Sequence, residues 1–222
     1  MLLRCPKKAP TDFNFFKPVW FLIVRVVFQK TKMSHLQIET ARLRMRPFTI
    51  ADVDALHRHW TQPEVRKYLW DDIIIPRVQV VDVVESSITN FAQHGFGLWA
   101  LFPQDQPELI GFCGFRFFGE PPEIEILYSI APERSGRGLA TEAVRAMLRY
   151  GFEQHKLARI YAGADPPNAA SFRVMEKCGM KFAKRMRINN LKAVYYLIVR
   201  EDFLADDSRY LVQPIEQSRV TL

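Results

Sequence analysis

The stretch "APERSGRGLATEAVRAML", residues 131–148, decides the fold of this chain. Gly136 and Gly138 stand two apart in it, and a helical pattern of small and apolar residues follows directly. Glycine adopts positive φ angles and lets the backbone approach another group closely. The first amides of a helix have no intrahelical partner and lie at the positive end of its dipole. We predict a turn that opens into a helix near Leu139 and forms an anion site, with a nucleotide diphosphate as the obvious occupant.

Taken alone, this loop is a weak signal. No Gly-Lys-Ser/Thr follows it, and Thr141 stands where a dinucleotide-binding GxGxxG motif would need its last glycine. A plain glycine turn between strand and helix therefore stays open as the alternative.

The elements around the loop predict a mixed α/β (α+β) fold. Alternating or continuous apolar runs predict strands at 42–48, 96–103, 108–119, 123–132, 158–165, 180–188 and 192–201. Helical spacing and capping residues predict helices at 49–60, 61–70, 77–95, from 139 onward, and at 168–179. Antiparallel strands come first and a parallel crossover follows.

The charge is concentrated outside this body. The net charge is +7, yet residues 1–33 hold seven Lys/Arg against one acid, and the other 189 residues hold 24 basic and 23 acidic side chains. The body is nearly neutral, which argues against nucleic acid as a partner and predicts no acidic or basic docking surface.

The first 33 residues form an extension of uncertain order. Residues 18–28, "PVWFLIVRVVF", are apolar but interrupted by Arg25, and the run is shorter than the ~20 residues of a spanning helix. A signal or anchor, a packed or membrane-associating amphipathic piece, and a segment upstream of a natural start at Met33 all stay open. We expect no membrane partner, a folded domain over residues 34–204, and a polar tail over residues 205–222.

The cysteines indicate a reducing compartment. Cys5, Cys113 and Cys178 are odd in number, and their spacing fits neither a disulfide framework nor a zinc site. We therefore expect a cytoplasmic protein without a metal.

Two segments, "EIEILYSIAPERSGRGLATEAVRAMLRYGFE" and "ADPPNAASFRVMEKCGMKF", carry a recognisable pattern of residues. Its members are Glu125, Tyr128, Pro132, Gly138, Ala140, Thr141, Glu142, Asn168, Ser171, Lys177 and Gly179. In this pattern the chain resembles the GNAT superfamily of acyl-CoA N-acetyltransferases, in its RimJ/RimL-like branch, from about Leu36 to Phe203. The resemblance implies a central, mostly antiparallel twisted sheet of about seven strands, splayed at the cofactor site, with helices on both faces.

The resemblance also implies a cofactor site for acetyl-CoA. The loop residues assigned to its diphosphate are Ser135, Gly136, Arg137, Gly138, Leu139, Ala140 and Thr141. The Ser129 and Ile130 backbone would lie along pantetheine and polarise the thioester carbonyl. Asn168 would bond pantetheine as well as cap its helix. Ser135 departs from the family's Gln/Arg at that position.

Two residues are the candidates for catalysis. Transfer needs a neutral amine, so we expect Glu125 to take the amine proton or to bind the amine, with Glu123 in reserve. A strand-end carboxylate on a solvated face is the alternative for Glu125. Ser171 is a candidate for protonating the leaving thiolate, against a plain helix-surface hydroxyl. The helix tyrosine that many family members use as general acid has no counterpart near Met175.

The remaining polar and aromatic residues are expected to be structural. We expect His57 and His59 to be exposed and without a role, Cys178 to be a packed residue, and one of Tyr195 and Tyr196 to be core. The competing function is a catalytically silent CoA-binding module. The acceptor is left open between a small amine and a protein N-terminus, and the resemblance leaves a homodimer open.

Overall fold

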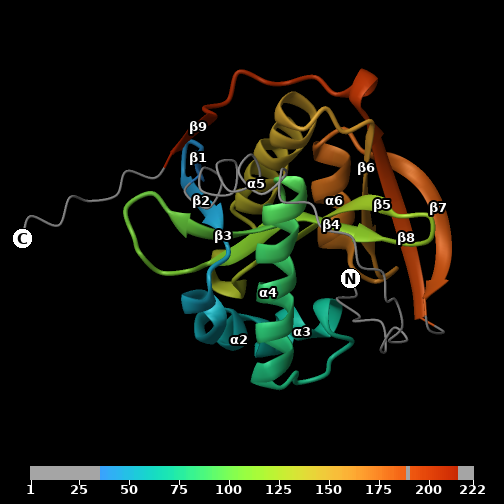
Figure 1. The fold of residues 1–222 in the computed structure, drawn as a ribbon. Helices are drawn as coiled ribbons and strands as arrows, with labels where there is room; N and C mark the ends of the chain where they lie inside the picture. The colour runs from blue at the N-terminus through green and yellow to red at the C-terminus, as the bar shows by residue number, and fades with distance from the viewer. Residues whose placement is uncertain (1–35, 189–190, 215–222) are drawn as a thin grey trace, which may run out of the picture.

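The structure is a computed structural model that describes residues 36–188 and 191–214. In this part the strands are β1 (Leu36–Glu39), β2 (Leu43–Pro47), β3 (Leu98–Pro103), β4 (Gly111–Phe118), β5 (Glu123–Ile130), β6 (Arg159–Ala164), β7 (Lys181–Ile188), β8 (Leu191–Val199) and β9 (Leu211–Pro214). The α-helices are α2 (Val53–Thr61), α3 (Pro63–Leu69), α4 (Arg77–His94), α5 (Leu139–Arg149) and α6 (Ala169–Lys177) (Figure 1).

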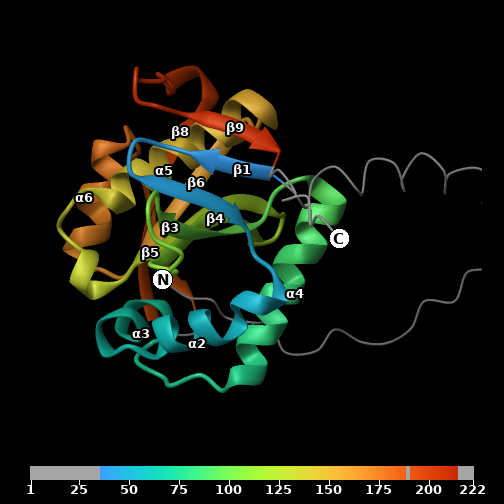
Figure 2. The ribbon, with the colours of Figure 1, turned by 90° about the vertical axis from the view of Figure 1, so that its left-hand side faces the viewer.

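The strands form one sheet with helices on both faces. The strand order is β7-β8-β6-β5-β4-β3-β2-β1-β9. Because successive side chains of a strand point to opposite faces, β5 contributes to two cores. Ile126 packs with residues of α5, and Leu127 packs with residues of α2, α3 and α4. Figure 2 shows α5 and α6 on one side of the sheet and α2–α4 on the other.

The sheet parts between β5 and β6. These two strands are the parallel pair of the sheet, and their register is a single position, Glu125 opposite Tyr161. β4 and β5, in contrast, pair along the whole of β5, from Glu123 to Ile130. In the described residues, the C-terminal part of β5 therefore has no ladder partner on its β6 side, and its backbone there is open to a ligand.

All seven predicted strands are present, and two more extend the sheet. β1 and β9 form an antiparallel pair in which Leu36 lies opposite Pro214. Residues 211–214 were expected in a polar tail, and this part of that expectation is wrong. Each strand has only four residues, too few for a periodic pattern, so their mutual pairing is what defines them. The 1–33 extension and the Asn189-Asn190 turn lie outside the described residues.

The predicted helix signals are confirmed. Thr49 and Asp52 form a capping box just before α2, and Asp52 also binds Arg46 through two 2.7 Å contacts. The valine-rich segment 77–95 is helical despite its β-branched residues, because Val80 and Val84 fall on one buried face. Gly95 ends α4 in the left-handed region, at φ 79°.

Candidate active site

The glycine loop has the predicted geometry. Gly136 and Gly138 have φ angles of 75° and 78°, which favour glycine, and α5 begins at Leu139. The loop is exposed. It therefore presents the first amides of α5 to solvent, at the positive end of the helix dipole.

The turn between β1 and β2 anchors this loop, which the sequence did not indicate. The Arg42 guanidinium donates to the Arg137 carbonyl at 2.8 Å and, through Nε, to Glu142 at 2.7 Å. Glu142 also accepts from the Thr40 hydroxyl at 2.6 Å and from the Arg42 amide at 2.9 Å. The segment before β2 thus holds both the loop and the first turn of α5. These contacts join residues about 100 positions apart, so no local sequence pattern could predict them.

A cleft of about 570 Å³ opens in front of the loop. α3 borders it with Glu64 and Tyr68, and α6 borders it with Arg173 and Lys177. The predicted site residues that line it are Ser129, Ile130, Ser135, Gly136, Gly138, Leu139, Ala140, Thr141, Asn168 and Ser171. The splay of the sheet thus brings β5, the loop and α6 to one cavity, large enough for a cofactor-sized ligand.

Two predicted residues do not belong to the lining of this cleft. Arg137 is exposed in the loop, and its carbonyl is held by Arg42. A phosphate contact from its side chain remains a prediction. Glu125 is the other, and it lies four residues before Ser129 on the same face of β5.

Glu125 is fully buried, at 0% exposure. Arg116 on β4 donates to its Oε2 from Nε at 2.8 Å and contacts it through a terminal nitrogen at 2.7 Å. Among the described residues, Oε1 has no hydrogen-bond partner, and it lies against the backbone of Gly163. The alternative of a carboxylate on a solvated face is therefore wrong for Glu125. Glu123, two residues earlier, is the surface carboxylate, paired with Arg159.

Tyr195 packs beside Glu125 and is the buried member of the tyrosine pair, as expected. Burial and the neighbouring Glu125 carboxylate raise the pKa of its phenol. A Cβ on Gly163 would meet the Tyr195 ring at 2.8 Å and the Glu125 carboxylate at 3.0 Å. Glycine at this position is what lets the ring and the carboxylate approach the backbone.

The N-terminus of α6 carries the other predicted pair. Asn168 caps the helix, and its side chain accepts from the Ser171 amide at 3.2 Å. The Tyr128 hydroxyl donates to the Ser171 carbonyl at 3.0 Å. Burial raises the pKa of Tyr128, so its hydroxyl keeps its proton. Met175 is fully buried in the core, in line with the expectation that this helix presents no tyrosine to the cleft.

His59 is buried, and the expectation that it is exposed is wrong. It is 4% exposed, and its Nε2 lies 3.0 Å from the hydroxyl of Ser129. Burial lowers its pKa from 6.5 to about 4, so the ring is neutral near pH 7. The signal was present in the sequence, since position 59 is three after Leu56 and therefore falls on the inner face of α2. His57 bonds the Ile75 carbonyl at 3.0 Å instead.

The described residues contain no metal-binding group and no helix that could span a membrane. Between residues 36 and 214, outside the 189–190 gap, no group of three His, Cys, Asp or Glu side chains is arranged to hold a metal ion. No helix in that part is long and apolar enough to cross a bilayer. Cys113 and Cys178 are buried free thiols, and burial raises the pKa of Cys178 to about 12.

A sheet splayed beside a glycine loop and a capped helix is a distinctive architecture, and comparison with known proteins identifies its class. The family model described as "Acetyltransferase (GNAT) domain" matches residues 42–181. The chain belongs to this family.

Individual relatives support the same assignment. An uncharacterized N-acetyltransferase of Bacillus subtilis, YnaD, is 30% identical over 175 residues, which cover 76% of this chain and 99% of that protein. A GNAT-family acetyltransferase structure from Bacillus anthracis is 27% identical, with a TM-score of 0.63 over 74% of this chain and 99% of its own. The structure of RimL, a ribosomal L7/L12 α-N-protein acetyltransferase in complex with coenzyme A, is 18% identical, with a TM-score of 0.61 over 72% of this chain and 95% of its own. This last likeness concerns the fold alone.

Proposed function

We propose that the protein transfers the acetyl group of acetyl-CoA to a primary amine by direct attack in a ternary complex. The observation that carries the proposal is the cleft itself. One cavity is lined by the start of α5, by the end of β5 that has no β6 partner, and by the capped start of α6. This order suits a long ligand with a diphosphate at one end and a thioester further along.

Different residues would bind successive parts of that ligand. The loop from Ser135 to Thr141 would hold the diphosphate, with Arg137 as an added phosphate contact. The Asn168 side chain would bond the pantetheine arm. The Ser129 and Ile130 backbone would polarise the thioester carbonyl, because the missing β6 pairing leaves this edge of β5 open to the ligand.

In the chemical step, the amine nitrogen would attack the carbonyl carbon of the thioester. The carbon–nitrogen bond forms, the carbon–sulfur bond breaks, and CoA leaves as a thiolate. Glu125 would take the amine proton, directly or through water. Ser171 would give its hydroxyl proton to the thiolate and regain one from solvent, so that the products are the amide and the CoA thiol. The buried Glu125 carboxylate needs its ion pair with Arg116 for this role, because an unpaired buried charge would destabilise the fold.

Thermal unfolding of the full chain with acetyl-CoA, CoA or ATP tests the cofactor. A ligand at about 100 times its Kd adds about 2.7 kcal/mol to the free energy of unfolding, which is several degrees for a domain of this size. We expect acetyl-CoA and CoA to raise Tm and ATP to leave it unchanged. No rise with either CoA species would refute the cofactor assignment.

A catalytically silent CoA-binding module is the competing function. It predicts the same Tm shift but no acetyl transfer to any amine. The acceptor class is a small amine or a protein N-terminus, and we place the protein in the cytoplasm because of its cysteine content.

A further inference from the structure

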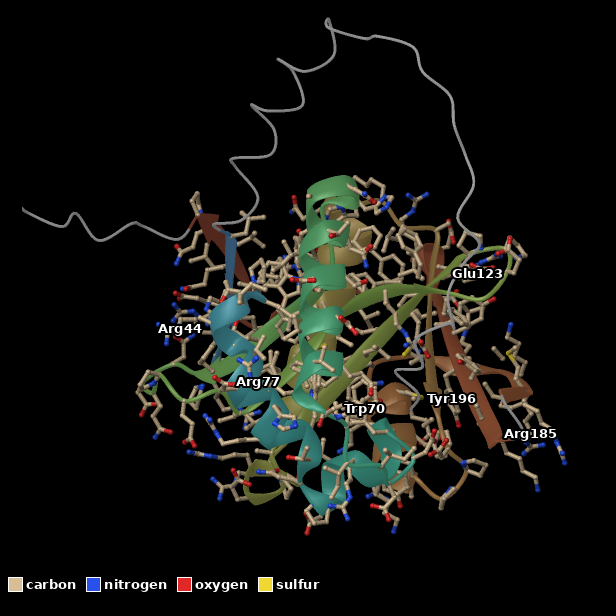
Figure 3. All side chains as sticks on the ribbon, turned by 60° about the horizontal axis from the view of Figure 1, so that its bottom comes forward. Arg44, Trp70, Arg77, Glu123, Arg185 and Tyr196 are labelled. Atoms are coloured by element: carbon tan, nitrogen blue, oxygen red, sulfur yellow. The ribbon has the colours of Figure 1, made fainter. Side chains whose placement is uncertain are left out.

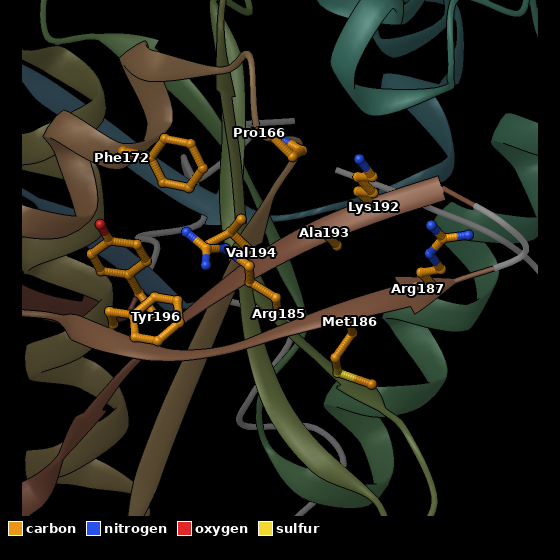
Figure 4. A pocket seen from close by; sticks show the side chains of 10 residues that line it. Pro166, Phe172, Arg185, Met186, Arg187, Lys192, Ala193, Val194 and Tyr196 are labelled. Atoms are coloured by element: carbon orange, nitrogen blue, oxygen red, sulfur yellow. The ribbon is translucent and has the colours of Figure 1, made fainter.

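A second hollow lies outside the cleft, between α6 and the β7–β8 hairpin. Its volume is about 660 Å³, and it shares no lining residue with the cleft. The rings of Phe172, Phe182 and Tyr196 line one part of it. Phe182 is 55% exposed, so part of its ring is open to a ligand in this hollow. Figure 4 shows Phe172 and Tyr196 at one end of this groove.

The other end of the groove is cationic. Arg185, Arg187 and Lys192 line it, and its lining contains no carboxylate. In Figure 4, Arg185 stands between the aromatic end and the other two cations, and Figure 3 shows Arg185 at the outer rim of the molecule. The whole segment 181–192 has five basic residues and no acidic one. A balanced total charge therefore conceals a local concentration of basic residues, which the expectation of no basic docking surface did not consider.

The backbone beside the groove is also unpartnered. β7 is the last strand of the sheet, and in the described part of the chain it pairs with β8 alone. Its outer edge can accept a further strand. A polypeptide can continue this ladder of amide hydrogen bonds and a nucleic acid cannot, so the edge favours a polypeptide partner.

Charged residues on an edge strand also serve to prevent unwanted pairing. That role needs charges along the edge but no hollow with aromatic walls. Here Arg185 lies over the Phe182 ring at 5.6 Å, and Phe172 packs on Tyr196 with ring centroids 5.6 Å apart. The cations therefore belong to a shaped groove as well as to an edge.

We propose that this groove docks an acidic, extended segment of a polypeptide partner. The segment would pair with the outer edge of β7, place carboxylates on Arg185, Arg187 and Lys192, and lay apolar side chains on the three rings. The groove is close to the cleft, because Pro166 and Phe172 line the groove while Asn168 and Ser171 line the cleft. A docked partner would thus lie beside the first turn of α6.

The test measures binding of short labelled peptides to the full chain by fluorescence anisotropy. A peptide of alternating Glu and Val is compared with one of alternating Gln and Val. We expect the acidic peptide to bind at least about tenfold more tightly, and Arg185→Glu with Arg187→Glu to remove this preference. The matched control, Arg58→Glu with Lys156→Glu, has the same charge change on exposed residues outside the groove and should bind like the wild type.

Three results would overturn the proposal. Equal binding of the two peptides would show that carboxylates are not recognised. Unchanged binding by the groove variant would place the site elsewhere. Competition by a thymidine oligonucleotide of the same charge, with the same dependence on Arg185 and Arg187, would show a general polyanion site. If the double variant does not fold, Arg187→Gln alone replaces it in the binding measurement. An unchanged Tm then shows that this single variant is folded.

Discussion

Glu125 is a buried carboxylate with one ion-pair partner, Arg116, and one oxygen that no described group bonds. A buried charge that is only half satisfied is costly unless function requires it. This geometry suits an oxygen kept for a proton or an ammonium group. The buried Glu125 carboxylate also requires the ion pair with Arg116.

We predict that Glu125→Gln slows acetyl transfer by about a hundredfold or more, because general-base catalysis contributes that much. Glu123→Gln is the matched control, since it removes a surface carboxylate two residues away and should change the rate little. A Glu125→Gln enzyme with full rate and an unchanged pH profile would exclude Glu125 as the base.

His59 predicts how stability depends on pH. Its pKa in the folded protein is about 4, below 6.5 for the free side chain. Between these pH values the unfolded chain binds more protons, so the stability is complete above pH 6.5 and falls as the pH falls. The loss between pH 7 and pH 5 should be about 2 kcal/mol from this one residue.

Urea unfolding at the two pH values measures this loss. His59→Gln, which cannot titrate and can still bond Ser129, should lose less stability over the same range. An identical loss in the variant would show that other groups account for the pH dependence.

At the scale of elements, the start of α5 depends on the segment before β2. Arg42 and Thr40 hold the loop and Glu142 through four hydrogen bonds of 2.6–2.9 Å. The proposed diphosphate loop is therefore held in part by a turn far away in the sequence.

We predict that Arg42→Ala raises the KM for acetyl-CoA about tenfold, which corresponds to about 1.4 kcal/mol. The KM for acetyl-pantetheine, which lacks the diphosphate, should stay unchanged. Arg44→Ala is the control, because Arg44 lies two residues further on, in β2, and stacks on Phe102. Equal effects on both substrates would mean that Arg42 supports the fold and not the loop.

At the scale of the whole molecule, the parts that could be predicted are those with local causes. The glycine turn, the start of α5 and the Asn168 cap are encoded within a few residues, and all three are present. The contacts that could not be predicted join distant segments. His59 and Ser129 are 70 residues apart, and β1 pairs with β9 across nearly the whole described chain. Such contacts follow from the strand order, which no short pattern contains.

The burial of Glu125 shows the same limit. The pattern placed it on the correct strand and face, but its environment comes from Arg116, Gly163 and Tyr195 on three other strands. The basic residues of the β7–β8 hairpin are visible in the sequence. Only the structure shows that three of them line a groove.

Acetyl transfer from acetyl-CoA to a panel of amines, followed by mass spectrometry, tests whether the protein is an N-acetyltransferase. The panel contains peptide α-amines, lysine, polyamines and aminoglycosides, and Gly138→Asp is run beside the wild type. We predict that the wild type acetylates at least one class and that Gly138→Asp loses this activity, because aspartate strains the φ of 78° and brings negative charge to the anion site. CoA binding without acetylation of any amine would show a silent CoA-binding module, and full activity in Gly138→Asp would show that the glycine loop does not hold the diphosphate.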